Sequence, residues 1–465
     1  MERSLKRLNA GAQLLTIILV CATPLFAQWE PDRRLTNDFN WSGLAYNNAR
    51  CIATAPGGVT HVVWEDNRDS NMEIYYKRST DAGTSWTTDT RLTNSTRSSR
   101  YPSIAVTGST LFLFWQENFQ IFYRRSTDSG GSWSAVDSFP TSRSDVFPCV
   151  FASGANVYVV WQSGTTSSNY IYYRQSSNSG GTWSTVTTLA YVPAALLQKP
   201  AIAAWGMNLH VVWQQDIQQI NYRRSRTGGA TWEAATRLSF TINQAINPSI
   251  TVSDTTVHVV WSGSRPYLYY KVSYSNGTTW ANEAPLTSGG DESWYPSIIS
   301  SQNNLHLVWQ EAGRDANPEV YYKSSSNAGG TWSSDVRLSN IPDASISPFV
   351  ATSDNGVHVV WSDTRDGNNE VYYKRNLTGN SGIEYKEGIP SNSQEKTLKV
   401  EPNPFSSSAV IRGGEKESFT AYDITGKRVG TQRGDRIGED LEPGVYFLRP
   451  AVGMGDRLIR IIKLK

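Results

Sequence analysis

The sequence is poor in the residues that mark several common classes of protein. It holds three cysteines, four methionines and five histidines in 465 residues, and its formal net charge is only +2. So small a net charge gives no field that would attract nucleic acid or an anionic surface, and no nucleic-acid partner is expected. No glycine-rich phosphate loop stands between a strand and a helix, and no G-x-S-x-G motif occurs. These absences exclude the usual signatures of nucleotide-binding proteins and α/β-hydrolases.

The apolar run near the N-terminus is typical of a signal peptide. Basic residues precede the aliphatic residues 14–20, and small residues follow up to Ala27. This pattern predicts a secretory signal peptide over residues 1–27, cut near Ala27. The run is too short to be a membrane anchor, so no transmembrane segment is expected in the mature chain. A lipoprotein signal at Cys21 is the alternative, and Val20 directly before it argues against that.

Tryptophan and tyrosine are plentiful, with 17 and 23 residues, and most of them fall on a repeat. Residues 75–86 have the pattern of a strand end, a turn with short polar side chains and a glycine, and a closing tryptophan. Related turns close at Trp133, Trp183, Trp232, Trp280 and Trp332. An apolar pair followed by a tryptophan precedes each turn and occurs once more after the last turn. The seven tryptophans are 46 to 52 residues apart: Trp64, Trp115, Trp161, Trp213, Trp261, Trp309 and Trp361. That period is the size of a four-stranded propeller blade.

The mismatch between seven copies of the second strand and six turns predicts how the ring closes. The seventh unit loses the pattern after Lys374, without a fourth strand, whereas residues 29–36 match residues 86–93. The N-terminal strand is therefore expected to complete the last blade and to remove an exposed sheet edge. The sequence predicts an all-β chain with a seven-bladed β-propeller over residues 29–375.

The turn carries a family resemblance. The pattern Ser-x-Asp-x-Gly-x-x-Trp is relaxed in four turns and intact in two, at Ser79, Asp81, Gly83 and Trp86 and at Ser126, Asp128, Gly130 and Trp133. It resembles the Asp-box, or BNR repeat, of sialidases and related β-propellers. Similar boxes occur in hydrolases, lectins and sorting receptors, so the resemblance implies the fold more than the function. In that family the box lies on the face opposite the ligand site, which implies that these eight residues are structural.

The opposite face would then hold any ligand. Sialidases clamp the substrate carboxylate with arginines, use a carboxylic acid as proton donor, and pair a tyrosine with a glutamate. The resemblance implies Arg50, just before a first strand, as a clamp arginine, and Arg68 and Asp69 as the arginine and acid. Tyr295 and Glu311 are candidate partners from a later blade.

The Arg-Asp pattern recurs, which leaves three interpretations open. It is repeated at Arg314 and Asp315 and at Arg365 and Asp366. Local pairing of arginine and aspartate that braces each loop is the first interpretation. The second is a ligand contact repeated around the ring, as in a multivalent lectin, in which the loop residues Trp41 and Arg100 would take part. The third is catalysis.

Metal and thiol chemistry are not expected. The five histidines all stand in the second strands of blades, so they are a feature of the repeat and not a metal cluster. Neither a cofactor nor a metal site is predicted; the Asp-rich loops could hold calcium, but none has EF-hand spacing. Cys51 and Cys149 fall in corresponding strands two repeats apart and are expected to be buried, unpaired thiols.

The C-terminal part differs in composition. Residues 376–396 are polar and predict a linker, and residues 397–465 alternate apolar and polar positions between turn signals, which predicts a small β-sandwich. The Pro-Asn-Pro, Thr-Gly-Lys and Glu-Pro-Gly-Val-Tyr motifs, in this order, resemble the type A sorting domain of the bacterial type IX secretion system. The resemblance implies the type IX secretion machinery as a partner and a secreted or outer-membrane location. An immunoglobulin-like accessory domain is the alternative.

Three functions agree with these observations. The first is a propeller that recognises glycans, glycoconjugates or proteins without catalysis. The second is an exo-sialidase-like glycoside hydrolase, and the third is a purely structural surface protein.

Overall fold

The computed structural model divides the chain into two compact units, Met1–Glu384 and Tyr385–Lys465. It describes residues 29–46, 50–140, 144–165, 168–193, 195–240, 244–263, 267–287, 292–353 and 356–377 of the first unit, and 399–401, 406–412, 418–423, 428–433, 435–450 and 459–463 of the second. The predicted signal peptide lies outside the described residues, as does nearly all of the predicted linker.

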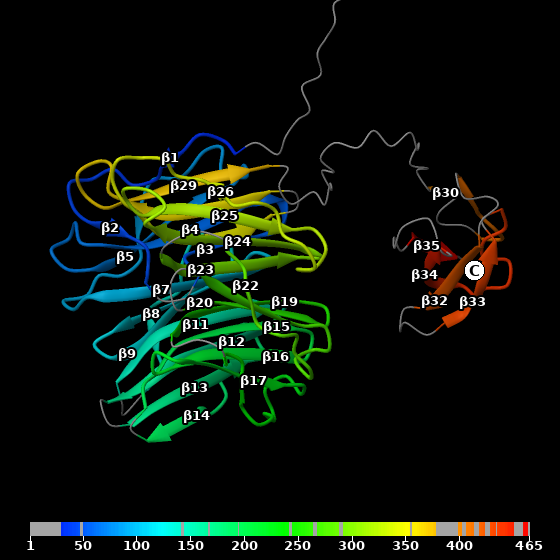
Figure 1. Ribbon diagram of the computed structural model, residues 1–465, viewed down its shortest axis with the longest axis horizontal. Helices are drawn as coiled ribbons and strands as arrows, with labels where there is room; N and C mark the ends of the chain where they lie inside the picture. The colour runs from blue at the N-terminus through cyan, green and yellow to red at the C-terminus, as the bar shows by residue number, and fades with distance from the viewer. Residues whose placement is uncertain are drawn as a thin grey trace, which may run out of the picture. The chain divides into compact units, whose positions relative to one another are not determined.

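The first unit is a seven-bladed β-propeller of antiparallel sheets, as predicted (Figure 1). From the inner to the outer strand, blade 1 is β3 (Ile52–Thr54), β4 (Thr60–Asp66), β5 (Glu73–Ser79) and β6 (Thr90–Arg91). Blade 2 is β7 (Ser99–Thr107), β8 (Thr110–Glu117), β9 (Gln120–Ser126) and β10 (Asp137–Ser138), and blade 3 is β11 (Asp145–Ser153), β12 (Asn156–Thr165), β13 (Ser168–Ser176) and β14 (Thr187–Pro193). Blade 4 is β15 (Leu197–Trp205), β16 (Asn208–Gln215), β17 (Gln219–Ser225) and β18 (Thr236–Arg237). Blades 5 and 6 are β19 (Ala245–Ser253), β20 (Thr256–Gly263), β21 (Leu268–Ser273) and β22 (Ala284–Pro285); and β23 (Glu292–Ser301), β24 (Asn304–Ala312), β25 (Glu319–Ser325) and β26 (Val336–Arg337). The short strand β2 (Ser42–Gly43) also pairs with β4, and a 3-10 turn, η1 (Pro56–Gly58), joins β3 to β4.

Blade 7 closes the ring with the N-terminal strand, which confirms the predicted closure. It consists of β27 (Ser345–Thr352), β28 (Val357–Asp363), β29 (Glu370–Asn376) and β1 (Arg33–Arg34). Arg33 pairs with Tyr373 and Arg34 with Tyr372, and the Leu35 amide donates to the Val371 carbonyl at 2.8 Å. The outer edge of β29 is therefore covered by the start of the chain.

The tryptophans that define the repeat fill the spaces between blades. Trp64, Trp115, Trp161, Trp261, Trp309 and Trp361 are among the largest fully buried side chains. Both faces of each second strand are buried because a neighbouring blade covers each face, which explains the continuous apolar stretch before the tryptophan. Truncating one of these side chains to alanine would cost about 3–5 kcal/mol.

A cation on the third strand links each blade to the one before it. In six blades a lysine or arginine donates to a leucine carbonyl in or directly after the outer strand of the preceding blade, at 2.5–3.0 Å. The pairs are Lys77 to Leu35, Arg124 to Leu92, Arg223 to Leu189, Lys271 to Leu238, Lys323 to Leu286 and Lys374 to Leu338. In blade 3 the equivalent Arg174 instead lies over the Phe139 ring, 4.6 Å from its centre. The bond from Lys77 to Leu35 spans the closure, so it holds the N-terminal strand in place from the first blade.

The Ser-Asp-Gly-Trp turn, or its relaxed form, fastens each of blades 1 to 6 to its predecessor. Ser79 Oγ donates to Asp81 Oδ1 and accepts from the Gly83 amide, both at 2.7 Å, and Asp81 also accepts from the Ser85 amide at 2.8 Å. These hydrogen bonds hold the pKa of Asp81 below its usual value. Gly83 has a φ of +87°, and a Cβ there would lie 1.9 Å from the Tyr373 hydroxyl of blade 7, so this position requires glycine.

The same geometry recurs in the second turn. Ser126 Oγ donates to Asp128 Oδ1 at 2.7 Å, and a Cβ at Gly130 would lie 1.9 Å from the Tyr76 hydroxyl. The Trp133 ring meets Tyr76 edge to face, with centroids 5.3 Å apart. Each turn therefore packs on a tyrosine of the preceding blade.

The second unit contains a two-stranded sheet and a four-stranded sheet. The first pairs β30 (Lys399–Glu401) with β31 (Val410–Arg412); the second has the order β33 (Arg428–Arg433), β32 (Ser418–Asp423), β34 (Gly444–Pro450), β35 (Ile459–Lys463). One apolar cluster, including Val400, Ile411, Phe419 and Leu448, joins residues of both sheets. The β-sandwich and the sorting domain stay predictions. In the described part of the chain, no helix has the length and hydrophobicity needed to span a bilayer.

Candidate functional site

The strand register assigns the loops of the propeller to two faces. In blade 1, Thr60 pairs with Ser79 at one end of β4 and β5, and Asp66 pairs with Glu73 at the other. In blades 1 to 6 the Ser-Asp-Gly-Trp turns follow the first of these ends, and we call this side the turn face. The loops between second and third strands and the links to the next blade lie on the opposite side, the loop face.

On the loop face, six inner strands begin with the same backbone irregularity. The residue before a proline has a positive φ of 50–55°, and the register of the inner strand shifts at that point, in Tyr101, Phe147, Lys199, Asn247, Tyr295 and Ser347. Positive φ is costly for residues other than glycine, and its repetition in six blades marks a bulge built into the fold. We call these six residues the mouth ring, because the inner strands line the central channel and begin here.

Contacts between blades that are not neighbours show that mouth-ring side chains converge toward the axis. Lys199 of blade 4 places Nζ 2.5 Å from Asn247 Oδ1 and 5.3 Å from the centre of the Tyr295 ring of blade 6. Tyr295 in turn meets Tyr46, which precedes blade 1, with ring centroids 6.1 Å apart. On the other side Tyr101 and Phe147 pack edge to face at 4.6 Å. Aromatic rings and one amine therefore surround the entrance to the channel.

Lys199 is a cation with no carboxylate partner among the described residues. Its hydrogen bond goes to a neutral amide, and the face of Tyr295 supplies its other polar contact. Burial lowers the pKa of Lys199 to about 8. The ammonium group is thus poorly compensated in a partly desolvated position.

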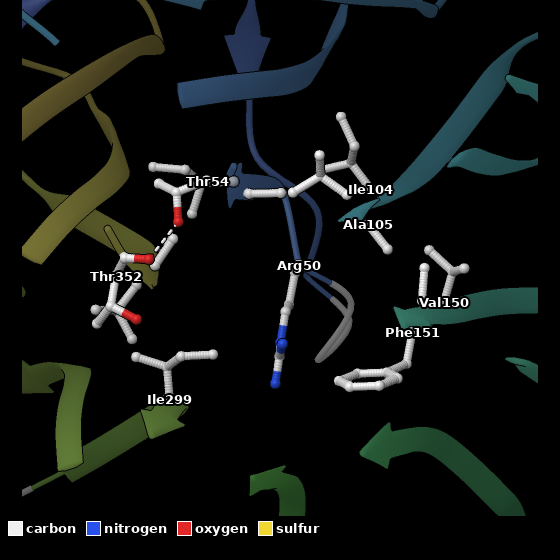
Figure 2. Close-up of a pocket in the computed structure, with 14 residues that line it drawn as sticks. Arg50, Thr54, Ile104, Ala105, Val150, Phe151, Ile299 and Thr352 are labelled. Carbon is white, nitrogen blue, oxygen red and sulfur yellow. Dashed lines mark hydrogen bonds between the residues drawn. The ribbon is translucent and has the colours of Figure 1, made fainter. Parts of the chain in front are cut away.

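A second cation lies inside the channel. Figure 2 shows the side chain of Arg50 extending into the space enclosed by Ile104, Val150, Phe151 and Ile299. This cavity has a volume of about 150 Å³. Among the described residues, Arg50 Nη2 donates a long hydrogen bond of 3.5 Å to the Ile250 carbonyl, and no carboxylate lies within ion-pair distance of the guanidinium. Burial lowers the pKa of Arg50, which remains a cation at neutral pH.

The third cation at the mouth, Arg100, is neutralised. The buried carboxylate of Glu65 accepts from Arg100 Nε at 3.1 Å and from the Tyr101 amide at 2.7 Å. The Arg100 guanidinium also lies 5.2 Å from the centre of the Tyr101 ring. Burial raises the pKa of Glu65, and burial together with the nearby Glu65 charge raises that of Tyr46. Arg100, predicted as a ligand contact, is therefore bound to Glu65.

The predicted pair Arg68 and Asp69 is held by its own blade. Arg68 forms ion pairs with Asp66 at 2.6 Å, Asp38 at 2.8 Å and Asp89 at 2.9 Å. Asp69 accepts from the Tyr75 hydroxyl at 2.5 Å. These carboxylates and hydrogen bonds raise the pKa of Arg68.

The other two Arg-Asp loops repeat this bracing. Arg314 pairs with Glu311 at 3.0 Å and Asp335 at 3.1 Å, and Arg365 with Asp363 at 2.7 Å and Asp32 at 2.9 Å. Asp315 accepts from the Tyr321 hydroxyl and Asp366 from the Tyr372 hydroxyl, both at 2.7 Å. Each arginine has carboxylates of its own blade around it. The geometry favours the first of the three interpretations, local bracing, for all six residues of these loops.

Trp41 and Glu311 also make contacts within the fold. The Trp41 ring lies against Gly43, and its amide donates to Asn67 Oδ1 at 2.7 Å. The buried Glu311 accepts from the Trp309 indole at 2.6 Å. Of the residues that the sequence singles out, the structure brings Arg50, Arg100 and Tyr295 to the channel or its mouth.

Sequence reasoning missed Tyr46, Glu65, Lys199 and Asn247. The signal that could have found two of them is the residue directly before the proline of each first strand, which is Lys199 in blade 4 and Asn247 in blade 5. Glu65 and Tyr46 have no such signal, because their role depends on contacts across blades. The aromatic rings and the two cations without a carboxylate partner among the described residues give the mouth the chemistry to hold a partly apolar, anionic molecule.

Comparison with known proteins supports the fold. No protein-family model and no curated protein matches the chain. Among solved structures, the polysaccharide lyase Uly1 is similar with a TM-score of 0.51 at 9% identity, over 75% of this chain and 99% of that one. A PL25 ulvan lyase bound to -[GlcA(1-4)Rha3S]- gives a TM-score of 0.51 at 10% identity, over 73% and 95%. The NanB sialidase of Streptococcus pneumoniae gives 0.45 at 12% identity, over 74% and 70%. The similar structures include sialidases, arabinofuranosidases and polysaccharide lyases built on propellers.

Proposed function

We propose that the protein recognises carbohydrate, and that the mouth ring together with Arg50 binds an acidic sugar unit of a glycan. The observation that carries this proposal is the pair of cations, Arg50 and Lys199, that have no carboxylate partner among the described residues. A desolvated cation is unfavourable unless an anion compensates it, and a carboxylate or sulfate on the ligand would do so. The Tyr101 and Tyr295 rings would pack against the apolar faces of the sugar.

Two further lines support this proposal. The ulvan lyase with a similar fold is bound to a chain that contains GlcA, and Uly1 is a polysaccharide lyase. The Asp-box resemblance of the turns also relates the chain to glycan-active propellers. We extend the proposal to location: the protein is secreted or displayed at the outer-membrane surface, exported through the signal peptide and sorted by the C-terminal unit.

A glycan array with acidic and neutral members tests the proposal on the full mature chain. We expect binding to acidic glycans that weakens as salt rises, and that weakens by about tenfold or more in Arg50→Ala and in Lys199→Met. Arg97→Ala is the matched control, because Arg97 is an exposed cation on the loop face that bonds Asn118. Equal binding by all four proteins, or binding to none of the glycans, would contradict the proposal.

An exo-sialidase-like hydrolase is the alternative, and one observation favours it. Burial and, after it, the charge of Glu65 raise the pKa of the Tyr46 phenol, so a tyrosine and a glutamate belong to the same part of the mouth. The resemblance to sialidases implies such a pair. A fluorogenic sialoside assay separates the two functions: turnover that is lost in Arg50→Ala would establish the hydrolase, and saturable binding without turnover would exclude it.

A further inference from the structure

Blade 3 has a longer outer edge than the other blades. Its outer strand, β14, spans seven residues, whereas β1, β6, β10, β18, β22 and β26 span two each. The extension is on the loop face, where Ser168 pairs with both Thr165 and Pro193. Six blades form and pack with two-residue outer strands, so the propeller does not need this extension. Figure 1 shows β13 and β14 as neighbouring strands at this edge.

Blade 3 also has uncharged residues where three other blades have an ion pair. In blades 1, 6 and 7 a buried glutamate at the start of the third strand pairs with an arginine of the outer strand: Glu73 with Arg91 at 3.0 Å, Glu319 with Arg337 at 2.6 Å and Glu370 with Arg34 at 2.7 Å. The same position in blade 3, directly before the Ile-Tyr-Tyr stretch, is Tyr170. Its partner across the strands is Tyr191. A charged brace has become an uncharged aromatic pair.

Three tyrosines of blade 3 form a continuous row, which we call the tyrosine row: Tyr172, Tyr170 and Tyr191. The Tyr170 ring stacks on Tyr172 at 5.3 Å and on Tyr191 at 4.6 Å, with interplanar angles of 25° and 17°. The buried Trp161 holds the inner end of the row, 5.8 Å from Tyr172. At the outer end Tyr191 is 47% exposed. A ring that is fixed by stacking on one side and open on the other loses little entropy when a ligand packs on it.

We infer that the tyrosine row is a second carbohydrate contact, which stacks against the apolar face of a neutral pyranose unit at Tyr191. This inference rests on the proposed function and adds a neutral sugar, held on the outer edge of blade 3, to the acidic sugar at the mouth. The chemistry fits because β14 has no charged residue, so an anion would find no partner on it. Among the described residues no further strand pairs with β14, so its edge also offers backbone groups to sugar hydroxyls, apart from the Leu189 carbonyl, which accepts from Arg223. A protein strand added to this edge is the competing occupant.

Affinity electrophoresis in gels that contain xylan, mannan, β-glucan or polygalacturonate tests the inference on the full mature chain. We expect at least one neutral polysaccharide to retard the wild type, and Tyr191→Ala to bind it about threefold to tenfold more weakly. Tyr191→Phe keeps the ring and should bind within twofold of the wild type. Tyr274→Ala is the matched control, because Tyr274 is also exposed, at 57%, but belongs to a turn-face loop. Thermal melting checks that each variant is folded.

The outcomes separate this inference from the proposed function. Arg50→Ala should lose binding to polygalacturonate and keep binding to the neutral polymer, and Tyr191→Ala should do the reverse. If the wild type binds polygalacturonate and Tyr191→Ala binds the neutral polymers as the wild type does, the inference is wrong and the proposed function stands. If light scattering shows a dimer that Tyr191→Ala abolishes, with no retardation by neutral polymers, the edge binds protein and the inference is also wrong. Binding to none of the four polymers contradicts both.

Discussion

Acidification to pH 5 should destabilise the propeller through its buried histidines. His61, His210, His258 and His358 stand in the second strands of four blades, and each is at most 1% exposed. The Nδ1 atom of each faces a tyrosine hydroxyl at 2.7–2.8 Å, whereas Nε2 of His61 and of His258 has no hydrogen-bond partner among the described residues. A second proton would therefore place a cation in an apolar site between blades.

The magnitude follows from the shifted pKa values. Burial lowers the pKa to about 3 in His61 and His210 and to about 4 in His258 and His358, from 6.5 in the unfolded chain. Because the folded state binds fewer protons, the stability from these groups is fully present above pH 6.5. It is lost as the pH falls from 6.5 toward the folded pKa. At pH 5 each histidine costs about 2 kcal/mol and the four together about 8 kcal/mol.

Urea unfolding at pH 7, 6 and 5, followed by tryptophan fluorescence, measures the effect. We expect the free energy of unfolding to fall steeply between pH 6.5 and 5. His61→Gln removes one titrating group and should reduce that fall by about a quarter. Carboxylates with a lowered pKa, such as Asp81, act below about pH 4 and do not contribute in this window. A free energy that stays constant from pH 7 to 5, or a His61→Gln variant with the wild-type pH dependence, would refute this reasoning.

Three further predictions concern the ligand site and the closure of the ring. Binding of an acidic glycan should weaken as the pH rises through about 8, because Lys199 must be protonated to hold an anion, and Lys199→Met should lose this pH dependence in a titration followed by calorimetry. Gly83→Ala should lower the free energy of unfolding by about 2 kcal/mol or more, since a Cβ there would lie 1.9 Å from the Tyr373 hydroxyl. The control is Gly57→Ala: Gly57 has a φ of +79°, but a Cβ there would meet no atom within 4 Å, so the change should cost only about 1 kcal/mol of backbone strain. Deleting residues 29–36 should expose the edge of β29 and cause aggregation in size-exclusion chromatography; a monomer with the wild-type melting temperature would contradict the closure.

The fold was largely predictable from the sequence because it repeats. A tryptophan every 46 to 52 residues and six turns with one residue pattern set the number of blades, and the match of residues 29–36 to residues 86–93 predicted the closure. Both signals are local, since each is found by comparing one short stretch of the sequence with another. Cys51 and Cys149 are free and buried, as their equivalent positions in the repeat predicted.

The site was predictable only in part, because it depends on contacts between blades far apart in the chain. Lys199 of blade 4 meets Tyr295 of blade 6, and Tyr46, before blade 1, also meets Tyr295, so both contacts join segments that are not neighbours in the chain. No spacing along the chain encodes such contacts, which arise when the inner strands, six of them bulged, meet at one mouth. The positive φ that directs these side chains occurs before proline in residues as different as Phe147, Lys199 and Ser347, so residue type did not reveal it either.

Arg50 and Arg68 show why residue identity alone could not separate a structural arginine from one that is available to a ligand. Both precede or follow a strand of blade 1 on the loop face, and the family resemblance pointed to both. Arg68 has three carboxylates within 2.9 Å, which hold it in place and neutralise it. An incoming carboxylate would have to displace one of them, at the cost of leaving a charge unpaired. Arg50 faces a cavity of about 150 Å³, and among the described residues its guanidinium donates to the Ile250 carbonyl at 3.5 Å, so an anion would supply a counter-charge that the described fold does not. Arg50 and Arg68 therefore differ in the carboxylates that other parts of the fold place around them. Substitution of Arg50 should affect ligand binding more than stability.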